Sequence, residues 1–178
     1  LLPSQSVMAG EEQRAPPQAR SAGTLGPAVM RAITEIQELM QPEDEEDEPD
    51  LVQAKIELDD LYERRFERMN DFEKSTLLNF YTNYYLNTED YPGAIGIFQQ
   101  MLEIETLRAD IRLRTHRSLG QLYASEEDWQ GSIDNYEQWR ILSDTEDEIV
   151  YRGLSYAHYQ LENFEEAKPF WIARMELL

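Results

Sequence analysis

Three arginines are the residues of this sequence best suited to bind a ligand. Arg114 and Arg117 lie three positions apart, and Arg152 lies in a later segment. They stand out because the chain has 36 Asp and Glu against 16 Lys and Arg, for a formal net charge of −20. A guanidinium group can hold a carboxylate through two parallel N–H bonds. The pattern therefore predicts recognition of an acidic or C-terminal carboxylate group.

Amide and aromatic side chains lie at positions equivalent to those of the arginines in the other predicted helices. Together these positions form one predicted surface, and every charged residue on it is an arginine. Such a surface can hold an extended peptide through bonds to its backbone. The alternative is that the arginines neutralise the protein's own acids or extend along helix faces. The predicted binding residues are Asn79, Asn83, Arg114, Arg117, Gln121, Arg152, Tyr156 and Tyr159.

The sequence offers little for catalysis or for a metal site. His116 and His158 fall at predicted helix-packing positions, without a His, a Cys or a paired acid at ligand spacing. No glycine-rich phosphate loop, nucleophile elbow or HExxH motif is present. The absence of cysteine rules out disulfides, thiolate zinc sites and cysteine nucleophiles. We therefore expect a non-enzymatic protein with no cofactor and no metal.

The elements that would position the binding residues are helical hairpins with a recurring pattern of small and large residues. Small residues let two antiparallel helix backbones approach, while bulky residues beside them fill the gaps. One series of small residues recurs after 38 and then 35 positions, and a second series precedes it by twelve positions each time. The two series are Ala94, Ser132 and Ala167, and Thr82, Gly120 and Ser155.

These offsets resemble the packing positions of the 34-residue tetratricopeptide (TPR) repeat. Around Ala94, bulky residues fall where that repeat has them, at Tyr81, Tyr85, Tyr91 and Phe98. The resemblance implies an all-α fold, a TPR-like α-solenoid of antiparallel helix hairpins. In such a fold the first helix of each hairpin lines a concave binding surface. An unrelated helical bundle is the alternative.

Residues 24–178 are predicted to form the helical array. It would comprise a degenerate hairpin at 27–69 and repeats at about 71–107, 113–142 and 147–178. Asp50 is expected to cap a helix starting at Leu51, and Asn70 with Glu73 is a capping-box signature for the next helix. The four residues in excess between the first two repeats would lengthen a helix through 103–107.

Two segments are predicted to lie outside the packed helices. Residues 1–23 have no apolar periodicity and are expected to be flexible. Within them, residues 1–9 resemble the end of a secretory signal cut after Ala9, the alternative being an ordinary disordered N-terminus. The acidic run 42–50 is predicted to be an enlarged loop. A calcium site there is disfavoured because the run lacks the Gly and the alternation of an EF-hand loop.

Charge and hydropathy narrow the class of partner. A net charge of −20 argues against binding to nucleic acid or to an anionic membrane surface. No apolar run approaches the roughly 18 residues that would span a bilayer, so no membrane insertion is expected. The last predicted helix, 165–178, is too apolar for the outer cap of a solenoid. Either further repeats follow it, or it packs against a partner or a second copy as a homo-oligomer.

Several segments of the repeats resemble a particular group of TPR proteins, over about residues 24–178. They are TLGP at 24–27, LNFYTNYY at 78–85, EDY at 89–91, IDNYEQW at 133–139 and YAHY at 156–159. They resemble the periplasmic TPR proteins encoded with TonB-type energy-transduction systems of Gram-negative bacteria. The resemblance implies a periplasmic accessory of a TonB–ExbB–ExbD complex that supports uptake of nutrients or iron across the outer membrane. TonB or ExbD-type periplasmic domains would then be its partners.

Two other functions fit the same repeats. A cytosolic (cytoplasmic) TPR adaptor or co-chaperone would grip an acidic or C-terminal peptide, although Asn83, Arg114 and Arg117 match the usual clamp of such proteins only in part. A complete signal peptide in the full-length N-terminus would exclude this location. Alternatively, the array is the docking module of a larger enzyme.

Overall fold

The computed structural model describes residues 23–44 and 47–178, so the predicted flexible segment 1–23, apart from Gly23, and the possible secretory signal at 1–9 lie outside the described residues. Within the described ranges the chain is all-α, as predicted, and contains no strand. None of these helices is both long and apolar enough to cross a membrane. The elements are α1 (Pro27–Met40), α2 (Leu51–Arg65), the short 3₁₀ helix η1 (Phe66–Arg68), α3 (Asp71–Asn87), α4 (Tyr91–Leu102), α5 (Ala109–Ser125), α6 (Trp129–Leu142), α7 (Glu148–Gln160) and α8 (Phe164–Leu177).

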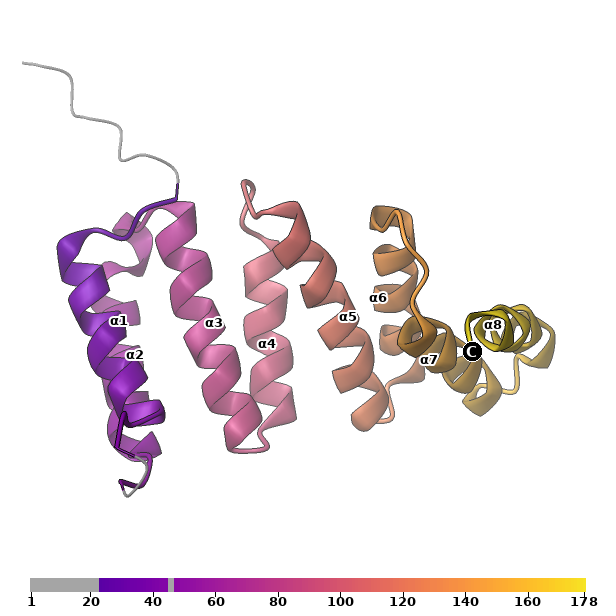
Figure 1. Cartoon of the computed structure of the whole chain (residues 1–178), viewed down its shortest axis with the longest axis horizontal. Helices are drawn as coiled ribbons and strands as arrows, with labels where there is room; N and C mark the ends of the chain where they lie inside the picture. The colour runs from indigo at the N-terminus through magenta and orange to yellow at the C-terminus, as the bar shows by residue number, and fades with distance from the viewer. Residues whose placement is uncertain (1–22, 45–46) are drawn as a thin grey trace, which may run out of the picture.

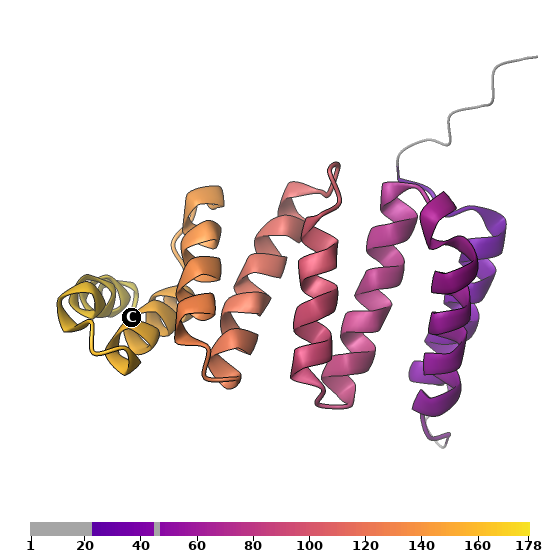
Figure 2. The ribbon, with the colours of Figure 1, turned by 180° about the vertical axis from the view of Figure 1, so that it is seen from behind.

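The helices stand in one elongated row, each beside its neighbour along the chain (Figure 1). The row has two layers, because α1, α3 and α5 face the viewer in Figure 1 while α2, α4 and α6 face the viewer in Figure 2. Contacts between alternate helices occur within the first layer, where α1 contacts α3 and α5 contacts α7. The helix axes rotate along the row, so that α8 is seen almost end-on where α3 lies in the plane of the picture.

Aspartate and asparagine side chains start most of these helices. Asp50 accepts a hydrogen bond from the backbone N–H of Gln53, and Asn70 accepts one from Glu73, both at 2.9 Å, so both predicted caps are confirmed. Asp90, Asp128 and Asp147 cap α4, α6 and α7 in the same way. Each cap satisfies an N–H group that has no partner within the helix, which contributes about 1 kcal/mol.

The small residues predicted at helix contacts are all buried. Thr82 is 2% exposed, and Ala94, Ser132 and Ser155 are fully buried. Ser132 also joins its two helices directly, since its hydroxyl donates to the Gly120 carbonyl at 2.8 Å. The pattern of small residues therefore located the close approaches between helices.

The turns of the last three hairpins share one backbone conformation. Each places a glutamate in the left-handed region, with φ of 56° at Glu89, 59° at Glu127 and 59° at Glu162. In each, the N–H after this glutamate donates across the helix end to a carbonyl five residues earlier, which is the Schellman motif. These bonds are Asp90 N to Tyr85 O at 2.8 Å, Asp128 N to Tyr123 O at 2.9 Å and Asn163 N to His158 O at 2.9 Å.

Replacing a left-handed glutamate by asparagine should stabilise the protein. An L-residue other than Asn, Asp or Gly pays roughly 1–2 kcal/mol in this region, so Glu127→Asn should raise the free energy of unfolding by about 0.5–1 kcal/mol. Urea denaturation measures this change. Glu126→Asn is the matched control, because it removes the same charge next door at a φ of −88°. An equal gain in both variants would mean that charge, and not backbone strain, sets the effect.

The prediction for residues 103–107 is wrong. The extra residues do not lengthen α4, which ends at Leu102, but form a connection to α5 that turns through i to i+3 bonds such as Ile104 N to Met101 O at 3.2 Å. Arg112 stabilises this end by donating to the carbonyls of Leu102 at 3.1 Å and Ile104 at 3.0 Å. The second helix of the hairpin predicted at 27–69 likewise stops short, at Arg65, and continues as η1.

Candidate peptide-binding face

The predicted binding residues lie on three alternate helices of the first layer. Asn79 and Asn83 are on α3, Arg114, Arg117 and Gln121 are on α5, and Arg152, Tyr156 and Tyr159 are on α7. All are exposed except Arg117, which is half-buried. We call this set of side chains the α3/α5/α7 face.

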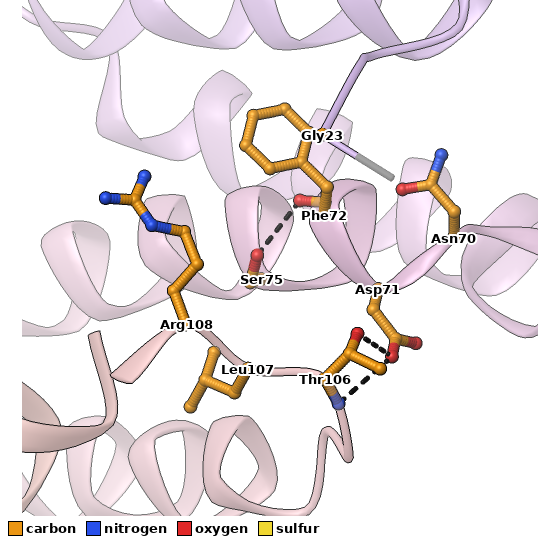
Figure 3. A pocket seen from close by; sticks show the side chains of 8 residues that line it. All are labelled: Gly23, Asn70, Asp71, Phe72, Ser75, Thr106, Leu107 and Arg108. Carbon is orange, nitrogen blue, oxygen red and sulfur yellow. Dashed lines mark hydrogen bonds between the residues drawn. The ribbon is translucent and has the colours of Figure 1, made fainter. Parts of the chain in front are cut away.

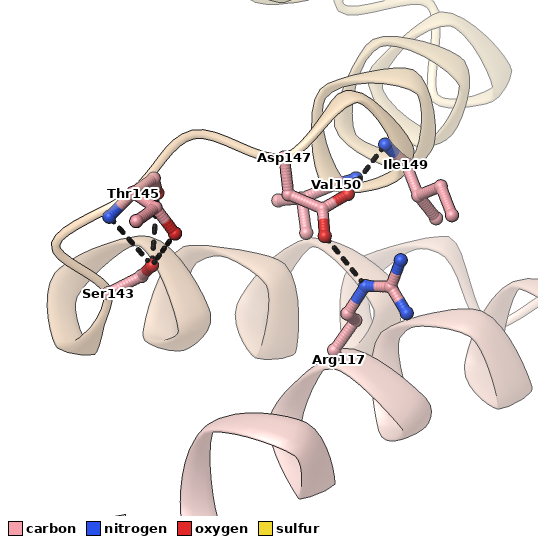
Figure 4. Close-up of polar contacts among 6 residues, drawn as sticks. All are labelled: Arg117, Ser143, Thr145, Asp147, Ile149 and Val150. Atoms are coloured by element: carbon pink, nitrogen blue, oxygen red, sulfur yellow. Dashed lines mark hydrogen bonds and ion pairs between the residues drawn. The ribbon is translucent and has the colours of Figure 1, made fainter. Parts of the chain in front are cut away.

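Arg117 is tied to the start of α7. Its Nε lies 3.0 Å from Oδ2 of Asp147, while the other oxygen of Asp147 accepts from the N–H groups of Ile149 at 2.8 Å and Val150 at 3.4 Å (Figure 4). One carboxylate therefore caps α7 and orients a guanidinium from α5. Part of the sequence-based alternative is thus correct, since this arginine does neutralise an acid of the protein itself.

The other two arginines are less constrained. Arg114 is exposed and approaches Asp110 only at 3.8 Å, a separation at which a surface ion pair contributes little. Arg152 is exposed and, among the described residues, has neither an ion pair nor a hydrogen bond from its side chain. Its guanidinium group is therefore available to a ligand.

Aromatic rings continue the face towards the end of the chain. The ring of Tyr156 meets Trp129 edge to face at 5.6 Å between centroids. The ring of Tyr159 contacts Phe164 at 5.5 Å and Trp171 at 6.0 Å. Because Tyr156 and Tyr159 both remain about half exposed, they can still contact a ligand.

Tyr136 of α6 reaches between α5 and α7. A Cβ atom built on Gly120 would lie 2.7 Å from its ring, and one built on Gly153 would lie 2.3 Å from it. Only glycine leaves room for the ring on both sides. Burial raises the pKa of Tyr136 to about 12, with Arg117 and Arg152 opposing the rise and Asp147 adding to it. The hydroxyl is therefore protonated at neutral pH.

Asn83 lies away from the arginines. It borders a pocket of about 210 Å³ with Gln37, Met40, Gln41 and Phe80, between α1 and α3. The predicted residues thus form no single cluster, since Asn83 lies beside α1 whereas Arg117 pairs with Asp147 at the start of α7. An extended ligand could contact both groups, whereas a small one could contact only one.

A larger pocket, of about 440 Å³, lies outside the predicted set (Figure 3). It forms where the start of α3 meets the α4–α5 connection, and Asp71 closes one side by accepting from the Thr106 hydroxyl. Thr106 and Leu107 of its lining belong to the extra residues 103–107, which the sequence-based prediction assigned to a helix. The lining residues are Gly23, Asn70, Asp71, Phe72, Ser75, Thr106, Leu107 and Arg108.

Both histidines make packing contacts. Nδ1 of His116 lies 3.0 Å from Oδ1 of Asn135, and the ring of His158 stacks on Phe170 at 5.7 Å. Within 23–44 and 47–178, no group of three or more His, Asp or Glu side chains is placed to hold a metal ion.

Comparison of the chain with protein-family models, with curated proteins and with solved structures found no match. The residues of the α3/α5/α7 face therefore carry the functional argument by themselves.

Two residues that contact the helices of this face are not among the predicted binding residues. Tyr136 follows the small Ser132 by four positions, as Phe98 follows Ala94, and this spacing predicts a packing role only. Asp147 is one acid among many in the run around 144–148, and nothing in its spacing points to Arg117. Gly120 on α5 and Gly153 on α7, which leave room for its ring on both sides, are the signal that could have revealed the position of Tyr136.

Proposed function

We propose that the protein is a TPR-like α-solenoid that binds an extended segment of a partner protein along the α3/α5/α7 face. It is a non-enzymatic scaffold, and the sequence resemblance makes it a periplasmic accessory of a TonB–ExbB–ExbD complex. One observation carries the proposal: alternate helices of one layer expose amides on α3, guanidinium groups on α5 and α7, and tyrosine rings on α7. Such side chains bind peptide backbones and carboxylates.

The repeated construction of the hairpins supports the same proposal. The left-handed glutamates recur with the 38- and 35-residue spacing of the buried small residues, so each hairpin repeats both a turn and a contact. Solenoids built from such units use one layer of helices as an extended binding surface.

The experiment uses purified periplasmic domains of TonB and ExbD from the same genome. Isothermal titration should show micromolar binding of at least one of them. The double variant Arg152→Gln/Tyr156→Ala should weaken it at least tenfold, about 1.4 kcal/mol, because it removes an unpaired cation and an exposed ring.

The matched control changes the other layer. Arg65→Gln/Ile56→Ala alters an exposed arginine and a side chain of similar exposure on α2, 54% against 51% for Tyr156. It should leave the affinity within twofold. Equal weakening in both double variants would contradict the assigned face, and no binding to either domain at millimolar concentration would contradict the TonB assignment.

A second candidate is an adaptor that grips a tail ending in a free carboxylate. The unpaired guanidinium group of Arg152 favours it. This candidate uses the same face and differs in compartment and partner.

A further inference from the structure

The first layer of helices is interrupted between α3 and α5. Within the described helices, α1 contacts α3 and α5 contacts α7, whereas α3 and α5 share no comparable contact. The buried small residues are 38 positions apart across this junction and 35 positions apart across the next one. The additional residues form the connection between α4 and α5, and the pocket of about 440 Å³ lies where this connection meets the start of α3 (Figure 3).

The lining of this pocket is mainly apolar. Figure 3 shows the ring of Phe72 on one side and the side chain of Leu107 on the other. Leu107 is 8% exposed and belongs to the same core as α1 to α3, so this side is fixed by packing. Phe72 is only half-buried, so its ring remains accessible. The volume falls within the range of pockets that hold ligands and is large enough for any amino-acid side chain.

The two ionised side chains of the lining are already bonded within the protein. Arg108 donates from Nε and from a terminal nitrogen to the two oxygens of Asp110, each at 3.0 Å. Asp71 is directed at Thr106 and accepts from its hydroxyl and its backbone N–H (Figure 3). A charged side chain that entered the pocket would lose its hydration without gaining an unpaired counter-charge. Charge complementarity therefore favours an uncharged occupant.

The pocket is continuous with the α3/α5/α7 face. Phe72 precedes Asn79 by seven residues and Asn83 by eleven, so the three side chains lie along one stripe of α3. On the other side, Arg108 directly precedes α5, which carries Arg114. A peptide that runs from the amides of α3 to the arginines of α5 therefore passes the mouth of the pocket.

We propose that this pocket binds one aromatic side chain of the bound segment. The inference rests on the proposed peptide-binding function and names what the segment must carry where it crosses from α3 to α5. An aromatic ring can pack against the ring of Phe72, and the guanidinium group of Arg108 can stack on its face. An aliphatic side chain gains neither of these contacts. A buried aromatic side chain in a pocket is also the usual energetic centre of a protein interface.

The first test follows the ¹⁵N-labelled full chain by NMR with three probes, the N-acetyl amides of phenylalanine, leucine and lysine. The phenylalanine probe should shift the backbone N–H signals of Thr106 and Leu107 to saturation, with a Kd of about 1 mM. The leucine probe should bind at least threefold more weakly, and the lysine probe should give no saturable shift. Linear shifts without saturation, or a leucine or lysine probe that binds as tightly as phenylalanine, would overturn the inference.

Ser75→Leu is the decisive variant because the new side chain extends into the pocket. Ser75 lines the pocket from α3, and its hydroxyl donates only within its own helix, to the Phe72 carbonyl at 3.0 Å. The variant should weaken binding of the phenylalanine probe at least tenfold and keep the melting temperature within about 2 °C of the parent. Ser125→Leu is the matched control, since that hydroxyl donates in the same way to Gln121 at the far end of α5. It should leave probe binding within twofold.

Phe72→Leu is a second variant that keeps an apolar side chain and removes the ring. It should weaken binding of the phenylalanine probe about threefold, to the level of the leucine probe. Unchanged affinity in this variant, or in a folded Ser75→Leu, would contradict the assigned pocket.

The partner domains separate this inference from the proposed function. Ser75→Leu should weaken binding of the TonB or ExbD domain at least tenfold in the titration described above. If the domain binds this variant as tightly as the parent, peptide binding stands and the pocket falls. If the phenylalanine probe saturates but neither domain binds, the aromatic pocket stands and the proposed function falls.

Photo-crosslinking identifies the occupant directly. A benzoylphenylalanine at position 108, at the mouth of the pocket, should crosslink the full chain to the bound domain. Crosslinks that reach only residues 1–22 of the same chain, or only a second copy, would give the pocket to those segments and overturn the inference.

Discussion

Gly153→Ala should destabilise the protein by about 2 kcal/mol, although the same change in a helix ordinarily stabilises it. The new methyl group would lie 2.3 Å from Cε2 of Tyr136, a ring already held against Gly120 on its other side. Since the ring is almost fully buried, it has no free space into which to move. Thermal denaturation should show the midpoint lowered by about 4–8 °C.

Gly96→Ala is the matched control for this substitution. Gly96 is exposed in the interior of α4, and a Cβ built there meets no atom within 4 Å. It should therefore gain about 0.5–1 kcal/mol from the reduced freedom of the unfolded chain. If Tyr136→Leu relieves most of the cost of Gly153→Ala in the double variant, the clash with the ring is its cause. If Gly153→Ala and Gly96→Ala change the free energy of unfolding in the same direction, the tight packing of Tyr136 between α5 and α7 is contradicted.

The packing contacts could be predicted from the sequence because they depend on side-chain size at fixed spacing. Thr82 and Ser132 are small enough to lie where two helices meet, and both are buried. The caps at Asp50 and Asn70 were predictable for a similar reason, since each needs only residues within one turn.

The connection after α4 could not be predicted because its apolar residues imitate a helix. Ile104 and Leu107 continue the spacing of Met101 and are buried in the same core as α1 to α3. They reach it through a turn whose freed carbonyls bond to Arg112, a residue of the following helix. The spacing of apolar residues indicates which side chains are buried, but it does not indicate the conformation of the backbone between them.

The candidate site was only half predictable. Exposed Arg152 and Tyr156 follow from helical position, whereas the contribution of Tyr136 depends on how far α5 and α7 lie apart. The left-handed glutamates were likewise hidden, because glycine or asparagine usually marks such a turn. In both cases the decisive fact is a contact between segments and not a property of one segment.

The side chain of Glu73, on α3, is expected to hold the hairpin of α1 and α2 against the helices that follow. It is fully buried, and its two oxygens accept from different segments, Oε1 from Gly26 N–H at 2.8 Å and Oε2 from Asn70 N–H at 3.0 Å. Glu73→Ala leaves both N–H groups without this acceptor and opens a cavity. We expect a loss of about 2–4 kcal/mol in the free energy of unfolding.

Hydrogen exchange can locate this loss as well as measure it. Because Gly26 leads directly into α1, the amides of α1 and of the first turn of α3 should exchange faster in Glu73→Ala, while those of α7 keep their protection. Glu73→Gln retains one acceptor oxygen and should lose less stability than Glu73→Ala. Glu67→Ala, an exposed change in η1, should stay within about 0.5 kcal/mol of the parent. A uniform loss of protection in all helices would instead mean that the helices unfold as one unit. The bonds of Glu73 would then stabilise the whole protein and not the region around α1 alone.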